Sequence, residues 1–99
     1  MKQFFIDWKF TVEDIIWNIK QIIPKFPVNF IETRQEYGNY YEIVKVEGES
    51  KEYKFKDDIE YENLEKIMEF MNKHLPDQSK HFVLITPGDD DYTYTLERK

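Results

Sequence analysis

Carboxylates are the most numerous chemically active side chains in this sequence. The chain has 20 Asp and Glu residues against 14 Lys and Arg, which gives a formal net charge of −6 at pH 7. Between positions 31 and 69 there are 12 acidic and 6 basic side chains, so this segment carries a charge equal to that of the whole chain. Such an excess repels nucleic acid and anionic membranes and accelerates association with basic molecules. The charge therefore predicts a basic protein partner, with no nucleic acid and no membrane.

Nucleophilic catalysis has few candidate residues. A serine nucleophile needs a base beside it, and that base needs a group that orients it. Ser50 follows a turn glycine in a charged stretch, and neither His74 nor His81 lies near it in the sequence. His74 falls in the last turn of an expected helix and His81 opens an expected strand, so we assign them capping or surface roles rather than metal ligation. We predict that the protein is not an enzyme and needs no cofactor.

Three consecutive carboxylates, Asp89, Asp90 and Asp91, could hold a hard cation or contact a basic partner. A calcium loop alternates its ligands with other residues and adds backbone carbonyls. Three adjacent side chains on a turn point in different directions instead. A solvated turn or a partner contact therefore fits this run better than a metal site, and we predict no bound metal.

The seven tyrosines, which we expect to be exposed, form the second group of interest. Tyrosine is enriched in the hot spots of protein interfaces, although alternate tyrosines on a sheet also pack across strands. A surface that combines tyrosine with carboxylate can both attract and hold a basic protein. The predicted partner-binding residues are Tyr40, Glu42, Glu47, Glu49, Glu52, Tyr53, Asp57, Asp58, Asp89, Asp90, Asp91 and Tyr92.

Two apolar stripes at helical spacing predict the helices that must position these side chains. The first begins after Thr11, whose side chain can cap a helix that carries Asp14 in its first turn, and it stops at Pro24. The second can be capped by Asp57 or Asp58 and is stopped by Pro76. Its buried stripe consists of Leu64, Ile67, Met68, Met71 and Leu75.

Alternation of apolar and polar residues predicts six strands. In the first, Phe4, Ile6, Trp8 and Phe10 form the buried face. The others are expected at 28–37, 40–47, 52–56, 81–86 and 92–96, with a two-residue turn at Gly38-Asn39. The expected order is strand, helix, three strands, helix and two strands. The three consecutive strands are joined by connections too short for parallel crossovers.

We therefore predict an α+β fold. Its mainly antiparallel sheet of about six strands and its two helices, both on one face of the sheet, form a two-layer sandwich. The length of 99 residues and the absence of any evident linker or internal repeat predict a single domain, 1–99. The absence of cysteine and of an apolar leader predicts a reducing, cytoplasmic location.

The expected strands and turns carry four short segments rich in carboxylate or tyrosine: Tyr40-Tyr41-Glu42, Glu47-Gly48-Glu49, Asp57-Asp58 and Asp89-Asp90-Asp91-Tyr92. A small acidic chain with these segments resembles the bacterial immunity proteins that neutralise polymorphic or contact-dependent toxins. The resemblance is in size, charge and composition. It rests on no diagnostic motif and transfers no functional residue. It implies a non-catalytic inhibitor that binds a basic toxin such as a nuclease. We expect the protein to be a monomer or weak dimer. The same features resemble phage proteins that mimic nucleic-acid charge and inhibit restriction or CRISPR enzymes.

A small enzyme or metabolite-binding domain is the alternative, with Trp8, Trp17 and neighbouring tyrosines around a ligand between the helices and the sheet. An enclosed pocket of several hundred cubic ångströms would favour this alternative. Trp17 falls off the isoleucine stripe of its helix, so it could instead belong to an interface. Self-association through an open edge strand is a third possibility.

Overall fold

The computed structural model describes residues 2–87 and 91–99. It contains two helices and six strands in the predicted order. The helices are α1 (Val12–Ile22) and α2 (Tyr61–Lys73); the strands are β1 (Gln3–Asp7), β2 (Val28–Glu36), β3 (Asn39–Val46), β4 (Glu52–Lys56), β5 (Lys80–Pro87) and β6 (Asp91–Arg98). All strand pairs are antiparallel, which confirms the predicted α+β class and strand direction. No helix in these described ranges is long and apolar enough to cross a membrane.

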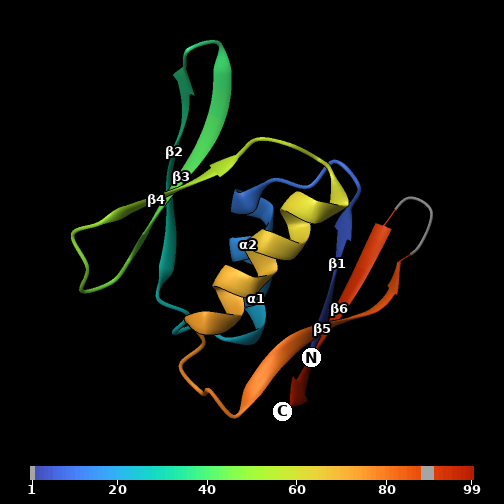
Figure 1. Cartoon of the computed structure of the whole chain (residues 1–99). Helices are drawn as coiled ribbons and strands as arrows, with labels where there is room; N and C mark the ends of the chain where they lie inside the picture. The colour runs from blue at the N-terminus through green and yellow to red at the C-terminus, as the bar shows by residue number, and fades with distance from the viewer. Residues whose placement is uncertain (1, 88–90) are drawn as a thin grey trace.

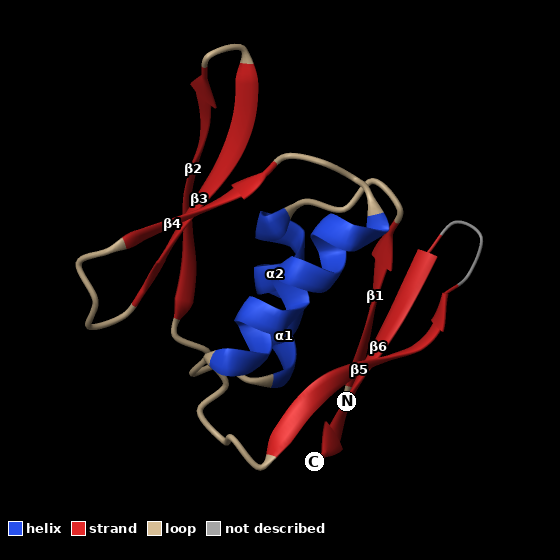
Figure 2. Cartoon of the chain, in the orientation of Figure 1, coloured by secondary structure: helices blue, strands red, loops and turns tan. Residues whose placement is uncertain are grey.

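The six strands form two three-stranded sheets, with the orders β1-β6-β5 and β2-β3-β4. Helix α1 contacts β1 and β2, and α2 contacts β4 and β5, so each helix touches both sheets. Figures 1 and 2 show the two helices lying between the sheets. The sandwich therefore has a sheet on either side of the helices, where the sequence predicted one sheet on one side. Two small sheets enclose the helices well, and Ile15, Ile16 and Ile19 of α1 are at most 4% exposed.

The order of elements repeats within the chain, since β1-α1-β2-β3 is followed by β4-α2-β5-β6. The first strand of each unit pairs with the last strand of the other, β1 with β6 and β4 with β3. Up to position 26, each residue of the first unit corresponds to the residue 49 positions later in the second unit. Position 3 thus matches position 52, position 11 matches 60, and position 26 matches 75. The sequence did not reveal this repeat, because the side chains at matching positions mostly differ.

The two helices begin in different ways. The hydroxyl of Thr11 accepts a hydrogen bond from the backbone N–H of Asp14 at 3.1 Å, which confirms the predicted cap of α1. Helix α2 has Glu60 at its N-cap position and no side-chain cap, so the cap predicted at Asp57 or Asp58 is wrong. Asp58 instead accepts the N–H of Glu60 at 3.0 Å and orders the residues just before the helix.

The hairpin between β2 and β3 turns at Tyr37 and Gly38, one residue earlier than predicted. Glu36 pairs with Asn39, and the φ angles of the two turn residues are 51° and 83°. A two-residue hairpin turn of this kind needs positive φ at both positions, which a tyrosine adopts at a cost of about 1 kcal/mol. The Tyr37 side chain is fully exposed at the tip of the hairpin.

Candidate functional site

Charge is polarised along the helices. Helices α1 and α2 run in the same general direction, so both begin at the end of the molecule that β1 and β4 reach (Figure 1). The segments 7–14 and 56–62 at this end hold seven acidic and two basic side chains, whereas 20–27 and 73–80 at the opposite end hold four lysines and one aspartate. Carboxylates are stabilised near the positive end of a helix dipole. Two helix dipoles therefore support the negative charge at one end.

Aromatic side chains accompany the carboxylates at this end. We name this surface the acidic end, and it consists of Asp7, Trp8, Tyr40, Asp57, Asp58, Tyr61, Asp91 and Tyr92. The rings of Tyr61 and Tyr92 stack with their centroids 5.9 Å apart, which joins the start of α2 to β6. The N–H of Asp57 donates to the carbonyl of Tyr40 at 3.0 Å, which joins the end of β4 to β3. Five of the predicted partner-binding residues thus lie together on this surface.

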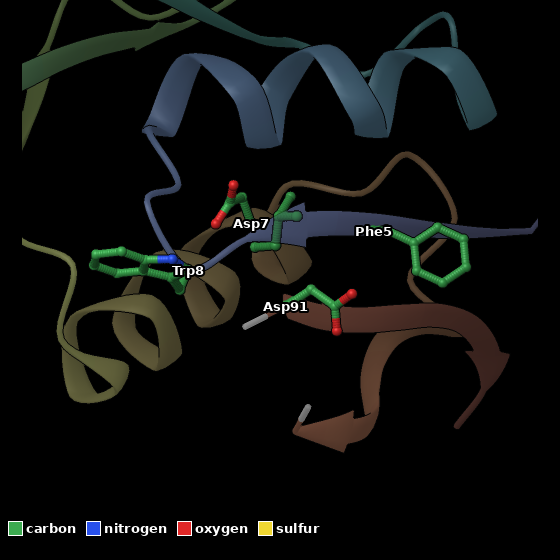
Figure 3. A pocket seen from close by; sticks show the side chains of 5 residues that line it. Phe5, Asp7, Trp8 and Asp91 are labelled. Atoms are coloured by element: carbon green, nitrogen blue, oxygen red, sulfur yellow. The ribbon is translucent and has the colours of Figure 1, made fainter. Parts of the chain in front are cut away.

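Asp7 and Asp91 occupy directly opposite positions on β1 and β6. Together with Phe5 and Trp8 they line an open cavity of about 420 Å³, shown in Figure 3. Like charges opposite one another destabilise a strand pair. The nearby ammonium group of Lys9 lies over the Trp8 ring, 5.0 Å from its centroid. Two acidic residues thus lie on neighbouring strands at this end of the sheet.

The acidic end includes residues that the sequence analysis did not assign to partner binding. Trp8 was expected on the buried face of the first strand, but β1 ends at Asp7 and Trp8 is 40% exposed. Asp7 accepts the backbone N–H of Lys9 at 3.2 Å, a local turn that ends the strand alternation. Asp7, two residues before Lys9, was the only signal for this turn in the sequence, and it is a weak signal.

Glu42 corrects the predicted surface, because it is buried. Glu42 is 4% exposed. Its two carboxyl oxygens both accept a hydrogen bond from the backbone N–H of Val12, at the start of α1, over 3.0 and 3.1 Å. Burial raises the pKa of Glu42 to about 7, and the nearby charges of Asp57 and Asp14 act in the same direction. Glu42 therefore caps a helix from inside the fold and makes no part of the docking surface.

Two other predicted residues, Glu47 and Glu49, lie in the turn between β3 and β4 at the opposite end of that sheet. Glu49 accepts a hydrogen bond from the hydroxyl of Tyr53 at 2.7 Å. Tyr53 is half-buried, and its ring packs against Phe70 with a centroid distance of 4.8 Å. The hydrogen bond to Glu49 raises the pKa of the Tyr53 hydroxyl. These residues support the local fold and are separate from the acidic end.

Cations neutralise the carboxylates on the outer face of the β2-β3-β4 sheet. Arg34 forms salt bridges with Glu32 at 2.6 Å and with Glu52 at 3.2 Å. Lys54 forms another with Glu36 at 2.9 Å. The hydrogen bond from Arg34 lowers the pKa of Glu52. The predicted partner-binding residue Glu52 is thus engaged within the protein.

The seven tyrosines differ in exposure. Tyr37, Tyr40 and Tyr61 are exposed, as predicted. Tyr94 is buried and stacks on Phe4 with a centroid distance of 5.5 Å, so its predicted exposure is wrong. The burial raises the pKa of its hydroxyl. The remaining three are half-buried.

The predicted sites Asp89 and Asp90 lie outside the described residues. Within residues 2–87 and 91–99, no group of three or more His, Asp or Glu side chains is arranged to hold a metal ion. No protein-family model, curated protein or solved structure is significantly similar to the chain. The functional assignment therefore depends on the geometry and charge of the molecule itself.

Proposed function

We propose that this chain is a non-catalytic inhibitory binding protein that docks a basic protein on its acidic end, as an immunity protein does when it neutralises a nuclease toxin. The observation that supports this proposal best is the gathering of exposed carboxylates and aromatic rings at one end, with lysines gathered at the other. The carboxylates of the outer sheet face, in contrast, are already paired with Arg34 and Lys54. A basic partner gains most from the carboxylates that lack such cations.

The two kinds of side chain would act at different stages of binding. Exposed carboxylates accelerate the encounter with a basic protein, and this acceleration weakens as salt is added. Aromatic side chains such as Tyr40 and Tyr61 supply contact area and a hydroxyl group at low entropic cost, which slows dissociation. A nuclease is a suitable partner, because its active site must be basic to hold phosphates.

The ligand-binding alternative receives no support from the cavities. It required an enclosed pocket between the helices and the sheet, with Trp8 and Trp17 around a ligand. In the described part of the chain, a continuous apolar cluster fills the centre between the helices and the sheets, and the groove of about 480 Å³ between α1 and β1 is open to the surface. Trp8 and Trp17 are exposed on the surface and line open grooves.

Affinity capture followed by an inhibition assay tests the proposal. The bait is the tagged wild-type protein, used beside two variants that each remove two charges. One variant carries Asp57→Asn and Asp91→Asn at the acidic end; in the described chain, neither side chain makes a hydrogen bond or salt bridge. The matched control carries Glu47→Gln and Glu97→Gln, which are exposed and remote from that end. Each captured protein is purified, and its association rate and its activity are measured with the three proteins.

We expect a captured basic protein whose toxic activity is inhibited by the wild type and by the control. The acidic-end variant should associate about tenfold more slowly at low salt, with the difference shrinking at high salt. A restriction or CRISPR enzyme as the inhibited partner would assign the phage-type alternative instead. Equal association rates for the two variants, or a partner that retains full activity when bound, would overturn the proposal.

A further inference from the structure

We infer that the groove between β1 and α1 receives an aromatic side chain of the partner. This inference rests on the proposed function for the basic character of that partner. The groove measures about 480 Å³ and is lined by Gln3, Phe5, Trp17, Asn18 and Gln21, among others. Trp17 is 62% exposed and Phe5 is 58% exposed. Two large rings thus stand at an open groove, where removing apolar surface from water would favour binding.

The internal repeat shows what fits in such a groove. The offset of 49 residues matches Gln21 of α1 to Phe70 of α2. Phe70 packs between the helix and the neighbouring strand, with ring centroids 4.8 Å from Tyr53 and 5.1 Å from Phe55. In the second unit, the groove is therefore filled by an aromatic ring of the chain itself. In the first unit, Gln21 is exposed and supplies no such ring.

A second matched pair points the same way. Asn18 of α1 corresponds to Ile67 of α2, which is 0% exposed. Asn18 is half-buried and lines the groove. The first unit thus has two polar amides where the second has an isoleucine and a phenylalanine. These amides leave the space open. Asn18 donates its amide N–H to the carbonyl of Asp14 at 2.8 Å, and the exposed amide of Gln21 offers hydrogen bonds to the backbone of an incoming segment.

The groove reaches the acidic end through Phe5, while Gln21 lies toward the opposite end of α1. Phe5 also lines the cavity of Asp7 and Asp91, and a further cavity of about 300 Å³ that includes Asp7, Asp14 and Trp17. The charged side chains that line these three connected cavities in the described chain are all acidic. An aromatic side chain flanked by lysine or arginine therefore matches the surface in both shape and charge.

A second copy of this chain is a poorer occupant. A symmetric dimer brings the same patch of both subunits together. The Asp7 and Asp14 carboxylates beside one groove would then face those of the other copy. Like charges brought together in this way oppose association.

Titration with peptides, followed by ¹H–¹⁵N NMR, tests the inference. The probes are a short peptide with one central phenylalanine flanked by lysines and arginines, and its counterpart with alanine at the centre. The key variant is Gln21→Phe, which places an aromatic side chain in the groove as Phe70 does in the other unit. Gln21 is exposed, so this change does not disturb the core. Trp17→Ala removes one wall of the groove and serves as a second variant.

For the wild type, we expect the phenylalanine peptide to bind about tenfold more tightly than the alanine peptide. It should shift the signals of the Trp17 indole N–H and of the Asn18 and Gln21 side-chain amides. In Gln21→Phe and in Trp17→Ala, the two peptides should bind equally, while both still shift the amides of Asp57 and Asp91.

Three results would overturn the inference. The first is equal binding of the two peptides to the wild type with shifts confined to the acidic end, which would leave the proposed function standing. The second is an undiminished preference for phenylalanine in Gln21→Phe. The third is a wild-type dimer in sedimentation that Trp17→Ala dissociates, because a second copy would then occupy the groove. A failure of the proposed function would differ from all three, since neither peptide would shift the acidic end.

Discussion

Replacing Glu42 with glutamine should change how the stability of the protein depends on pH. The buried carboxyl has a pKa of about 7 in the folded protein, against an ordinary value of 4.5. The folded state therefore holds the proton more tightly than the unfolded state does. Stability from this group is fully present below pH 4.5 and is lost as the pH rises through 7. In the wild type, the free energy of unfolding should thus fall between pH 5 and pH 7.

The size of the effect follows from the shift in the pKa of Glu42. Each pH unit between the two pKa values is worth about 1.4 kcal/mol, so the full interval is worth about 3 kcal/mol. Burial opposes the ionised form, while the hydrogen bonds from Val12 favour it. Glutamine has the shape of the protonated side chain and can still accept one of these bonds, but it does not titrate. At pH 8, Glu42→Gln should therefore be more stable than the wild type by about 2 kcal/mol or more, whereas at pH 5 the two should be similar.

Urea unfolding followed by circular dichroism at pH 5, 6, 7 and 8 measures this difference. Comparing the two proteins at each pH isolates Glu42, because every other titratable group is common to both. Glu47→Gln, which changes an exposed carboxyl just beyond the same strand, should follow the wild type. If Glu42→Gln kept the full slope of the wild type, or if wild-type stability rose between pH 5 and pH 7, the reasoning about the buried carboxyl would be refuted.

Four further substitutions test other features of the fold by urea or thermal unfolding. Tyr37→Asn gives the turn an asparagine–glycine pair suited to positive φ, and should stabilise the protein by about 1 kcal/mol; a loss of stability would contradict the strain assigned to this tyrosine. Thr11→Ala removes the cap of α1 and should cost about 1 kcal/mol, and no change would show that the cap is dispensable. Phe70→Gln opens the filled groove of the second unit and should lower stability by about 2 kcal/mol. Gln21→Phe, the reverse change at the matching position of the first unit, should alter stability by less than about 1 kcal/mol. Equal costs would contradict the difference between the two grooves.

The sequence was sufficient to predict the elements of the fold because local patterns determine them. The isoleucine stripe predicted α1, and Thr11 marked its start. The alternation of apolar residues predicted all six strands to within a few residues. The division of the strands into two sheets was not predictable in this way, because β1 pairs with β6 across almost the whole chain. Periodicity within a segment carries no information on such a distant partner.

The site was predicted in part for a similar reason. Composition predicted a surface that combines carboxylate with tyrosine, and Tyr40, Asp57, Asp58, Asp91 and Tyr92 lie on one surface. Composition could not distinguish a carboxylate in water from one paired with a neighbour. Glu52 and Glu42 looked alike in the sequence, but one forms a salt bridge with Arg34 and the other is buried under the start of α1. Both outcomes depend on residues that are remote in the sequence.

The repeat makes it possible to ask where the first unit gives up stability relative to the second. In β3 and β6, which have equal length, the fourth positions are Glu42 and Tyr94, and both are 4% exposed. A buried carboxyl in one unit thus corresponds to a stacked aromatic ring in the other. Gln21 and Phe70 differ in the same direction. Apolar packing at either position of the first unit would have been compatible with this topology, because the second unit achieves it. Glu42 lies at the start of α1 beside the acidic end, whereas Gln21 lies in the last turn of α1 beside β1, where it lines the proposed groove.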